Sequence, residues 1–243
     1  MARFYYDFHI HSCLSPCGDN DMTPNNIVNM ALLNHLDVIA VSDHNAMLNL
    51  PAIMSVAKEN GLVVIPAMEL QTAEDIHVLC LFSDLENALK FSDLIYDSIP
   101  KIKNKVNIYG EQQVLDESDN IKRLEENLLI VSSSYGVYEI PKLVKEYNGV
   151  AVLAHIDKAS NGAIAILGSI NPDMNYETVE ISKNCKPSFF EENSYIKRDY
   201  NIIYDSDAHY LWDIAEQKNY LDLETLTIEN VLKYISSKKK GGF

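Results

Sequence analysis

The sequence contains few residues of several kinds, and each shortage excludes a class of protein. The four cysteines, Cys13, Cys17, Cys80 and Cys185, are too few and too scattered for the disulfide framework of a small secreted domain. No apolar run is long enough to span a membrane, and the first residues lack the apolar stretch of an export signal. We therefore expect a cytoplasmic protein that has no membrane partner. Cys13 and Cys17 are expected to be free thiols, with an approach to a metal as the alternative.

Positive charge is also scarce. Twenty Lys and Arg residues against thirty-five Asp and Glu residues give a net charge of −15. Such a charge repels phosphate backbones and anionic lipids unless bound cations reverse it locally. We expect no long nucleic acid as a partner. The oligomeric state stays open, because no apolar stripe stands apart from those that a folded core needs.

The remaining composition is that of a globular protein. With 47% hydrophobic and 23% charged residues in a chain of 243, the sequence predicts one domain, 1–243, of barrel size. Short runs rich in Val, Ile and Tyr alternate with helical patterns, which is typical of parallel sheets or barrels built from βα units. The predicted strands cover 4–9, 37–41, 62–67, 76–82, 150–154, 178–181 and 201–204.

Helix signals lie between these strands. Thr23-Pro24 provides an N-cap and a proline at the first helical position. A second helix is predicted over 50–59, ending at Asn60-Gly61, and another over 228–235, followed by a basic tail that we expect to fray. The segment 84–148 is too long for a simple crossover and is predicted to be a helical insertion.

Within the insertion, charged residues are expected to face solvent. Lys101, Lys103 and Lys105 form a basic cluster, and 111–119 is acidic and predicted to be an exposed loop. The stretch 110–113 is a candidate lid, although no spacing supports it.

Histidines supply the strongest functional signal. Six of the seven lie in or just after predicted strands, beside carboxylates or small residues, whereas His35 falls in a helical pattern and is expected to be a surface or packing residue. Alternation along a strand places His9 and His11 on one face, where they can share a metal. Carboxyl ends of parallel barrel strands meet at one rim. The residues expected to converge there are His9, His11, His44, Glu69, His77, His155, Asp207 and His209.

Five segments resemble a known family. They are Asp7-x-His9-x-His11-Ser12, Ser42-Asp43-His44, Glu69 followed by His77-Val78-Leu79, Ala154-His155, and Ser206-Asp207-Ala208-His209. This pattern is similar to that of the PHP (polymerase and histidinol phosphatase) metal-dependent phosphoesterases. The resemblance implies an α/β fold, a distorted seven-stranded (β/α)7 TIM-like barrel with two or three metal ions at its rim.

The resemblance also implies a distribution of ligands. His9, His11, Glu69 and Asp207 would hold one metal, and Glu69 would bridge to a second held by His77 and His155. His44 and His209 would hold a third with one residue of the loop after His11. Relatives often have Ser-Asp-Gly shortly before Thr-Pro, but the loop here is longer; counting back from Thr23-Pro24 selects Asp19 and leaves Cys17 and Asp21 open. Mixed imidazole and carboxylate ligands fit Zn²⁺, Mn²⁺ or Fe²⁺.

Further residues flank these ligands. Asp7 and Asp43 are expected to orient imidazoles, with strand-end capping as the alternative. Lys158 is the first candidate for a phosphate-binding cation, with an ordinary exposed lysine as the alternative, and Arg198 and Lys183 are weaker candidates.

The expected activity follows from the metals. Clustered divalent ions lower the pKa of a bound water, so that a hydroxide near Glu69 could attack phosphorus. We expect a phosphoesterase that hydrolyses a small phosphorylated metabolite or a nucleotide phosphate. The alternatives are a nuclease or phosphodiesterase acting on short oligonucleotides, and a non-catalytic metal-binding module.

Overall fold

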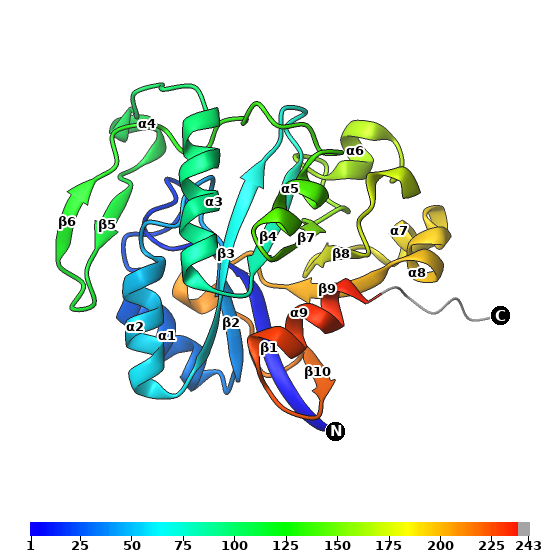
Figure 1. The fold of residues 1–243 in the computed structure, drawn as a ribbon, viewed down its shortest axis with the longest axis horizontal. Coiled ribbons are helices and arrows are strands. Elements are labelled where there is room, and N and C mark those ends of the chain that lie inside the picture. Colours follow the sequence, from blue (N-terminus) through cyan, green and yellow to red (C-terminus); the bar gives the residue numbers. More distant parts are fainter. Residues whose placement is uncertain (238–243) are drawn as a thin grey trace.

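A curled, mostly parallel sheet forms the centre of the molecule. The computed structural model describes residues 1–237, so the basic tail lies outside the described residues. Eight strands form the sheet in the order β10-β1-β2-β3-β4-β7-β8-β9 (Figure 1). Their bounds are β1 Ala2–Ile10, β2 Val38–Val41, β3 Val63–Gln71, β4 His77–Phe82, β7 Gly149–Leu153, β8 Thr178–Ser182, β9 Asn201–Asp205 and β10 Tyr220–Leu223.

The sheet curls until β9 lies beside β1. The backbone N–H of Phe8 donates to Asp205 Oδ1 at 2.6 Å, and Ile10 forms a parallel bridge with Ala208. The result is a half-barrel of the α/β class. Alternation along the strands sends one set of apolar side chains into its interior. That interior cluster includes Phe8, Ala40, Ile65, Leu79 and Val152.

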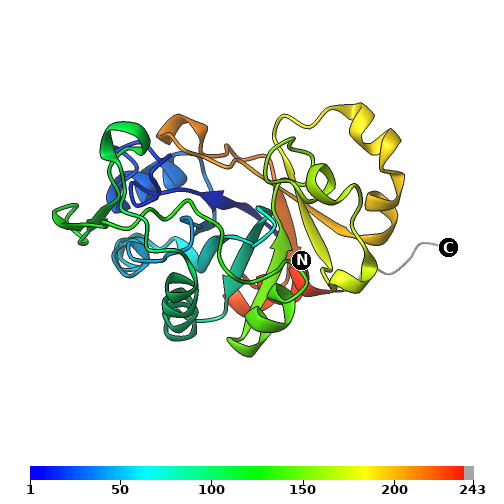
Figure 2. The same cartoon turned by 90° about the horizontal axis from the view of Figure 1, so that it is seen from above.

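Helices cover the outer face and one end of the sheet. They are α1 Pro24–Leu33, α2 Leu50–Asn60, α3 Leu85–Ser98, α4 Val106–Tyr109, α5 Ile140–Glu146, α6 Ala163–Leu167, α7 Pro187–Glu192, α8 Ser194–Asp199 and α9 Ile228–Ser236, with 3₁₀ turns η1 Pro172–Met174 and η2 Leu211–Asp213. Figure 2 shows α1, α2 and α3 at one end of the molecule and α7 and α8 at the other. Val231, Leu232 and Ile235 of α9 join the interior cluster. Among the described residues, no helix is both long and apolar enough to cross a membrane.

The helix boundaries follow the expected capping chemistry. Thr23 Oγ1 accepts from Asn26 N, and Pro24 opens α1. Gly61 ends α2 with a φ of 75°, a left-handed conformation that glycine adopts without strain.

All seven predicted segments are strands, but the strand arrangement differs from the prediction in two ways. The strand β10, which was not predicted, pairs antiparallel with β1 and makes the sheet eight-stranded. In addition, β4 is antiparallel to both β3 and β7. The connection between Gln71 and His77 is too short for a crossover, so the chain turns back as a hairpin. As a result, β4 brings its first residue, His77, to the rim where the parallel strands end.

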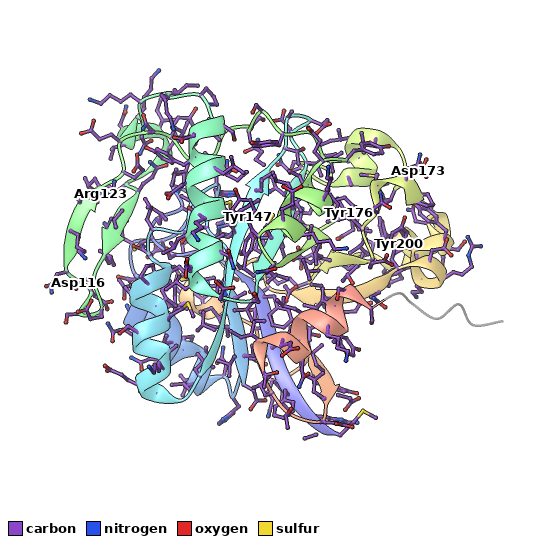
Figure 3. All side chains as sticks on the ribbon, in the orientation of Figure 1. Asp116, Arg123, Tyr147, Asp173, Tyr176 and Tyr200 are labelled. Atoms are coloured by element: carbon purple, nitrogen blue, oxygen red, sulfur yellow. The ribbon has the colours of Figure 1, made fainter. Side chains whose placement is uncertain are left out.

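The segment 84–148 is only partly helical. It contains α3, α4 and α5, but also a hairpin of β5 (Gln113–Leu115) and β6 (Ile121–Leu124). Gln112 to Leu115 are buried, so the prediction of an exposed loop over 111–119 is wrong for its first half. Asp119, near the hairpin turn, accepts a hydrogen bond from Thr23 Oγ1 at 2.7 Å and so docks the hairpin against the start of α1. Asp116 and Arg123 mark the hairpin in Figure 3. Lys101, Lys103 and Lys105 are exposed, as expected.

Candidate metal centre

Eight side chains predicted to ligate metal converge at the rim of the half-barrel. The strands β1, β3 and β4 carry three of them, and the others follow β1, β2, β7 or β9 by a few residues. They are His9, His11, His44, Glu69, His77, His155, Asp207 and His209. The seventh histidine, His35, is exposed just beyond the end of α1, as expected.

The carboxylate of Glu69 is the centre of this cluster. Five imidazole nitrogens surround it: His77 Nδ1 at 2.7 Å, His155 Nε2 at 3.0 Å and His9 Nε2 at 3.3 Å from Oε1, with His44 Nδ1 at 3.1 Å and His11 Nε2 at 3.3 Å from Oε2. Glu69 itself is completely buried. One oxygen therefore faces the β4 and β7 side of the rim, and the other faces the β2 side, which is the arrangement that a bridging carboxylate requires.

A second carboxylate closes the group around His9 and His11. Their Nε2 atoms lie 3.2 Å apart, and each is 3.4 Å from Asp207 Oδ1. With Glu69, these residues are the four ligands expected for one metal. Asp207 adopts a φ of 52° and His155 a φ of 28°. A left-handed conformation strains residues other than glycine, and such strain gathers at functional sites.

Unpaired buried atoms fit a bound cation. His44 Nδ1 and Glu69 Oε2 lie 3.1 Å apart, yet each is buried without a hydrogen-bond partner. His77 Nε2 and His155 Nδ1 are also buried and unpaired. Leaving such a group unsatisfied costs about 1–3 kcal/mol. A divalent ion bound by His44 and Glu69 would satisfy the imidazole and carboxylate atoms of that pair together, and both are donors that Zn²⁺, Mn²⁺ and Fe²⁺ accept.

The electrostatics of the cluster also fit a cation. Burial alone would lower the pKa of His11, but hydrogen bonds from its imidazole to the carboxylates of Asp207 and Glu69 raise it to about 9. Burial raises the pKa of Asp207, and His9 and His11 reverse the effect and hold it well below its usual range. In contrast, burial and the neighbouring His11 lower the pKa of His209 to about 4. The carboxylates thus draw positive charge onto imidazoles, and a metal ion would supply that charge in place of protons.

Glu180, a residue not singled out from the sequence, orients two of the ligands. Its carboxylate lies 3.0 and 3.1 Å from His9 Nδ1 and accepts the backbone N–H of His155 at 3.0 Å. A hydrogen bond at Nδ1 leaves Nε2 of His9 available to a metal. The only sequence signal is a single carboxylate inside the buried strand β8.

The two carboxylates expected to orient imidazoles act differently. Asp43 Oδ1 accepts from Ser15 Oγ at 2.6 Å, and Ser15 Oγ lies 3.0 Å from His11 Nδ1, so Asp43 reaches His11 through Ser15. Asp7 accepts the backbone N–H groups of Ser206 and Ala215 at 3.0 and 2.9 Å. It ties β1 to the loop after β9, which corresponds to the strand-end capping alternative.

The loop after His11 brings Cys17, and not Asp19, to the third group of ligands. Ligand atoms of His11, Cys17, His44 and His209 lie within 4.8 Å of one another. Asp19 Oδ1 accepts the backbone N–H of Asp21 at 2.9 Å instead. Neither aspartate belongs to the three metal-type groups that the described residues form.

Close backbone packing explains why Cys17, and not Asp19, lies near His11, His44 and His209. A Cβ atom on Gly18 would lie 2.4 Å from the carbonyl oxygen of Ser12, so glycine permits the tight turn that follows Cys17. Gly110, with a φ of 89°, packs against the carbonyl oxygen of Pro16, which lies at 2.9 Å from its ideal Cβ position. The segment 110–113, a candidate lid, is therefore a buried support for the Cys17 loop.

A pocket of about 150 Å³ opens over the cluster. Its lining comprises Cys17, His44, Glu69, His77, Ile130, His155, Lys158, Ser160, Asn161, Asp207 and His209. Larger hollows of about 540 and 650 Å³ lie beside α3 and near α5. The smaller pocket is the better candidate for a functional site, because the clustered imidazoles belong to its lining.

The three predicted phosphate-binding cations differ in position. Lys158 Nζ contacts Asp207 Oδ2 at the pocket wall. Burial alone would lower the pKa of Lys158, but Asp207 raises it, so the ammonium stays charged. Arg198 lies on α8, pairs with its neighbour Asp199 and has a side chain that is 70% exposed, so it does not line this pocket. Lys183 Nζ pairs with Asp213 Oδ1 at 2.9 Å.

Known proteins share this fold. A protein from Bifidobacterium adolescentis described as a metal-dependent phosphoesterase is 19% identical, with a TM-score of 0.63, 96% of this chain covered and 95% of that chain. The lesion-specific endonuclease PfuEndoQ from Pyrococcus furiosus is 15% identical with a TM-score of 0.72; the match covers 97% of this chain but 56% of that one. The present chain thus spans about half the length of that endonuclease. Among curated proteins, none matches.

One comparison corrects the expectation about partners. Endonuclease Q in complex with a 27-mer duplex carrying an abasic lesion is 15% identical, with a TM-score of 0.65 and 96% of this chain and 56% of that chain covered. A protein of this fold binds duplex DNA, so the expectation that net charge excludes long nucleic acid as a partner is wrong. Net charge averages over the whole surface, whereas binding depends on the charge at the site.

The family itself is shown by sequence. The PHP domain family model matches residues 7–196, which is well over half of the chain. That span includes His9, His11, His44, Glu69, His77 and His155, and Asp207 and His209 follow it. The chain belongs to the PHP domain family.

Proposed function

We propose that this protein is a metal-dependent phosphoesterase that hydrolyses the phosphate ester of a small metabolite or nucleotide. The observation that carries the proposal is Glu69, a buried carboxylate with five imidazoles within 3.3 Å and unpaired atoms around it. Such a donor set would hold two or three ions of Zn²⁺, Mn²⁺ or Fe²⁺. When bound, these ions would lower the pKa of a water molecule and neutralise phosphoryl oxygens.

The proposed ligands fall into three sets, of which the first two share Glu69. His9, His11, Glu69 and Asp207 form the first set, and Glu69, His77 and His155 form the second. In the third set, we propose that Cys17 takes the place expected for Asp19 beside His44 and His209, since its ligand atom lies within 4.8 Å of theirs. Because Glu69 belongs to two sets, its loss should disturb more than one ion.

Other residues of the chain position these ligands and the substrate. Glu180 keeps His9 Nε2 directed at the cluster, and Ser15 together with Asp43 does the same for His11. The ammonium of Lys158 at the pocket wall would bind a phosphate oxygen. A pocket of about 150 Å³ is smaller than the usual site for a whole small molecule, which measures roughly 300–1,000 Å³. It accommodates the phosphoryl group, and the rest of the ester would lie outside it.

A second candidate function is cleavage of phosphodiesters in nucleic acid. It is supported by the fold shared with endonuclease Q over 97% of this chain. Both functions need the same metals and the same attack on phosphorus, and they differ in the group that leaves.

The test combines metal analysis with two model substrates. Protein purified without chelator would be analysed for Zn, Mn and Fe, then assayed on p-nitrophenyl phosphate and bis-p-nitrophenyl phosphate with and without added Mn²⁺ or Zn²⁺. Bound metal with metal-dependent turnover of the monoester supports the phosphatase, whereas preference for the diester supports the nuclease. Bound metal without turnover of either ester would indicate a non-catalytic metal-binding module. Inactive protein that cannot be loaded with metal would contradict the ligand assignment.

A further inference from the structure

Two aromatic residues form an exposed stacked pair in the loop that carries His209. The ring centroids of Tyr210 and Trp212 lie 4.9 Å apart, and the ring planes differ by 12°. Trp212, the only tryptophan of the chain, is 77% exposed, and Tyr210 is 40% exposed. Tryptophan is highly buried on average, and its ring contributes most when it is covered. A flat pair left open to solvent therefore offers a surface for a planar ligand.

The pair stands beside the metal centre. Tyr210 directly follows His209, and three residues of chain limit the separation of the His209 and Trp212 Cα atoms to about 11 Å. Lys183, which directly follows β8 at the same rim, pairs with Asp213, the neighbour of Trp212. In Figure 2 the orange segment that contains Trp212 lies beside the blue helix α1, and Asn34 Nδ2, just after this helix, donates to the carbonyl oxygen of Ile214 at 3.0 Å.

We propose that Tyr210 and Trp212 form a stacking platform for a nucleobase of the substrate, which would make the hydrolysed ester a nucleotide or an oligonucleotide. The inference rests on the proposed phosphoesterase function. The pocket accommodates little more than a phosphoryl group, so the remainder of the ester must lie on the rim. Every nucleobase has a flat π-face that stacks on aromatic side chains. Lys158 pairs with Asp207 and Lys183 with Asp213, two residues of the loop that carries His209, so both ammonium groups lie at this loop, where phosphates would bind.

The stacked geometry favours a base over a protein partner. Ring planes held within 12° of each other already present a flat face before the ligand arrives, which reduces the entropy lost on binding. A protein partner would use the same exposed tryptophan as an anchor. That alternative predicts association of two chains and is an outcome of the test.

Because Trp212 is the only tryptophan of the chain, its fluorescence reports directly on stacking of a base. Metal-loaded protein would be titrated with an adenosine 5′-phosphonate in which a methylene group replaces the ester oxygen, so that no hydrolysis occurs. The corresponding ribose 5-phosphonate, which has the same phosphonate group but no base, is the control ligand. Stacking predicts saturable quenching of Trp212 fluorescence by the adenosine analogue and little change with the ribose analogue. Equal binding of the two analogues would overturn the proposal.

Variants test the platform without fluorescence. By calorimetry, Trp212→Ala and Tyr210→Ala should each weaken binding of the adenosine analogue by about 5- to 150-fold, the equivalent of about 1–3 kcal/mol per stacked base. Binding of the ribose analogue should stay unchanged. Tyr138→Ala is the control, because Tyr138 is equally an exposed aromatic residue but lines the hollow near α5. Unchanged adenosine binding in both platform variants would contradict the proposal.

Further outcomes separate this proposal from related ones. Binding of the adenosine analogue through Trp212 without any esterase activity would support the platform and reject the phosphoesterase function. Esterase activity without a preference for the base would support the phosphoesterase function and reject the platform. A dimer that Trp212→Ala converts to a monomer, together with no base preference, would assign the pair to self-association. Tighter quenching by oligothymidylate than by thymidine 5′-phosphate would identify an oligonucleotide as the source of the base, and equal quenching a mononucleotide.

Discussion

The two ends of the metal centre are built differently. At one end, Glu69 and His77 lie on strands and His155 lies two residues beyond the end of one, and all three are buried. At the other end, His44, His209 and Cys17 lie on loops, and Cys17 is exposed. The first end offers nitrogen and oxygen donors, and the second adds sulfur. Strand-borne ligands are held by the sheet, whereas loop-borne ligands can vary in position and type. If the cluster holds metal as we propose, we expect the strand-borne end to keep its ion and the loop-borne end to accept ions of different identity.

The largest effect is expected from Glu69, whose Oε1 faces His77 and His155 at the buried end and whose Oε2 faces His44 at the loop-borne end. Glu69→Gln replaces a bridging carboxylate by an amide, which carries no charge and binds metals poorly. We expect loss of metal from both ends and a fall in turnover of more than about 100-fold, above the range typical for residues that only orient ligands. Elemental analysis and the p-nitrophenyl phosphate assay measure both effects. Glu59→Gln, on the exposed side of α2, is the matched control. Full metal content in Glu69→Gln would refute a bridging role.

Removing one imidazole from each end would separate them. His155→Ala should lower the metal content by about one ion per chain at the buried end and leave the Cys17 end loaded. His209→Ala should do the reverse. Co²⁺ reports the difference, because a cobalt–thiolate charge-transfer band should survive in His155→Ala and disappear in His209→Ala. Loss of the band in both variants would mean that the two ends bind metal as one unit.

An intermediate effect is expected at Glu180, which orients His9 and accepts the backbone N–H of His155 at the buried end. Glu180→Gln keeps the shape but weakens the hydrogen bond to His9 Nδ1. Metal affinity should fall by about 10- to 100-fold, with the ligands themselves intact. Competition with a chelator of known affinity measures the change, and excess metal should restore turnover. An affinity equal to that of the parent would limit Glu180 to a structural role in β8.

The sequence predicts the positions of the strands and the convergence of eight side chains around Glu69, because alternation along strands and His-rich strand ends carry both signals. It does not predict the direction of β4, since an apolar run looks the same in either direction. Glu180 is missed because it lies inside a strand, away from the strand ends where ligands were expected. Which residue of the loop lies beside His44 and His209 depends on the tight turn at Gly18, and counting residues back from Thr23-Pro24 does not detect a turn.

The smallest effect on turnover, and the sharpest spectroscopic one, is expected at Cys17. In Cys17→Ser, the cobalt–thiolate band should vanish, while turnover with Mn²⁺ falls only several-fold, because the buried end is unchanged. Cys17→Asp should recover metal content without the band, since a carboxylate can replace the thiolate as a donor. Cys185→Ser, at a partly exposed thiol away from the pocket, is the control and should retain the band. Metal bound at Cys17 should also protect it from alkylation. A cobalt band that persists in Cys17→Ser would remove sulfur from the centre and, with it, the chemical difference between the two ends.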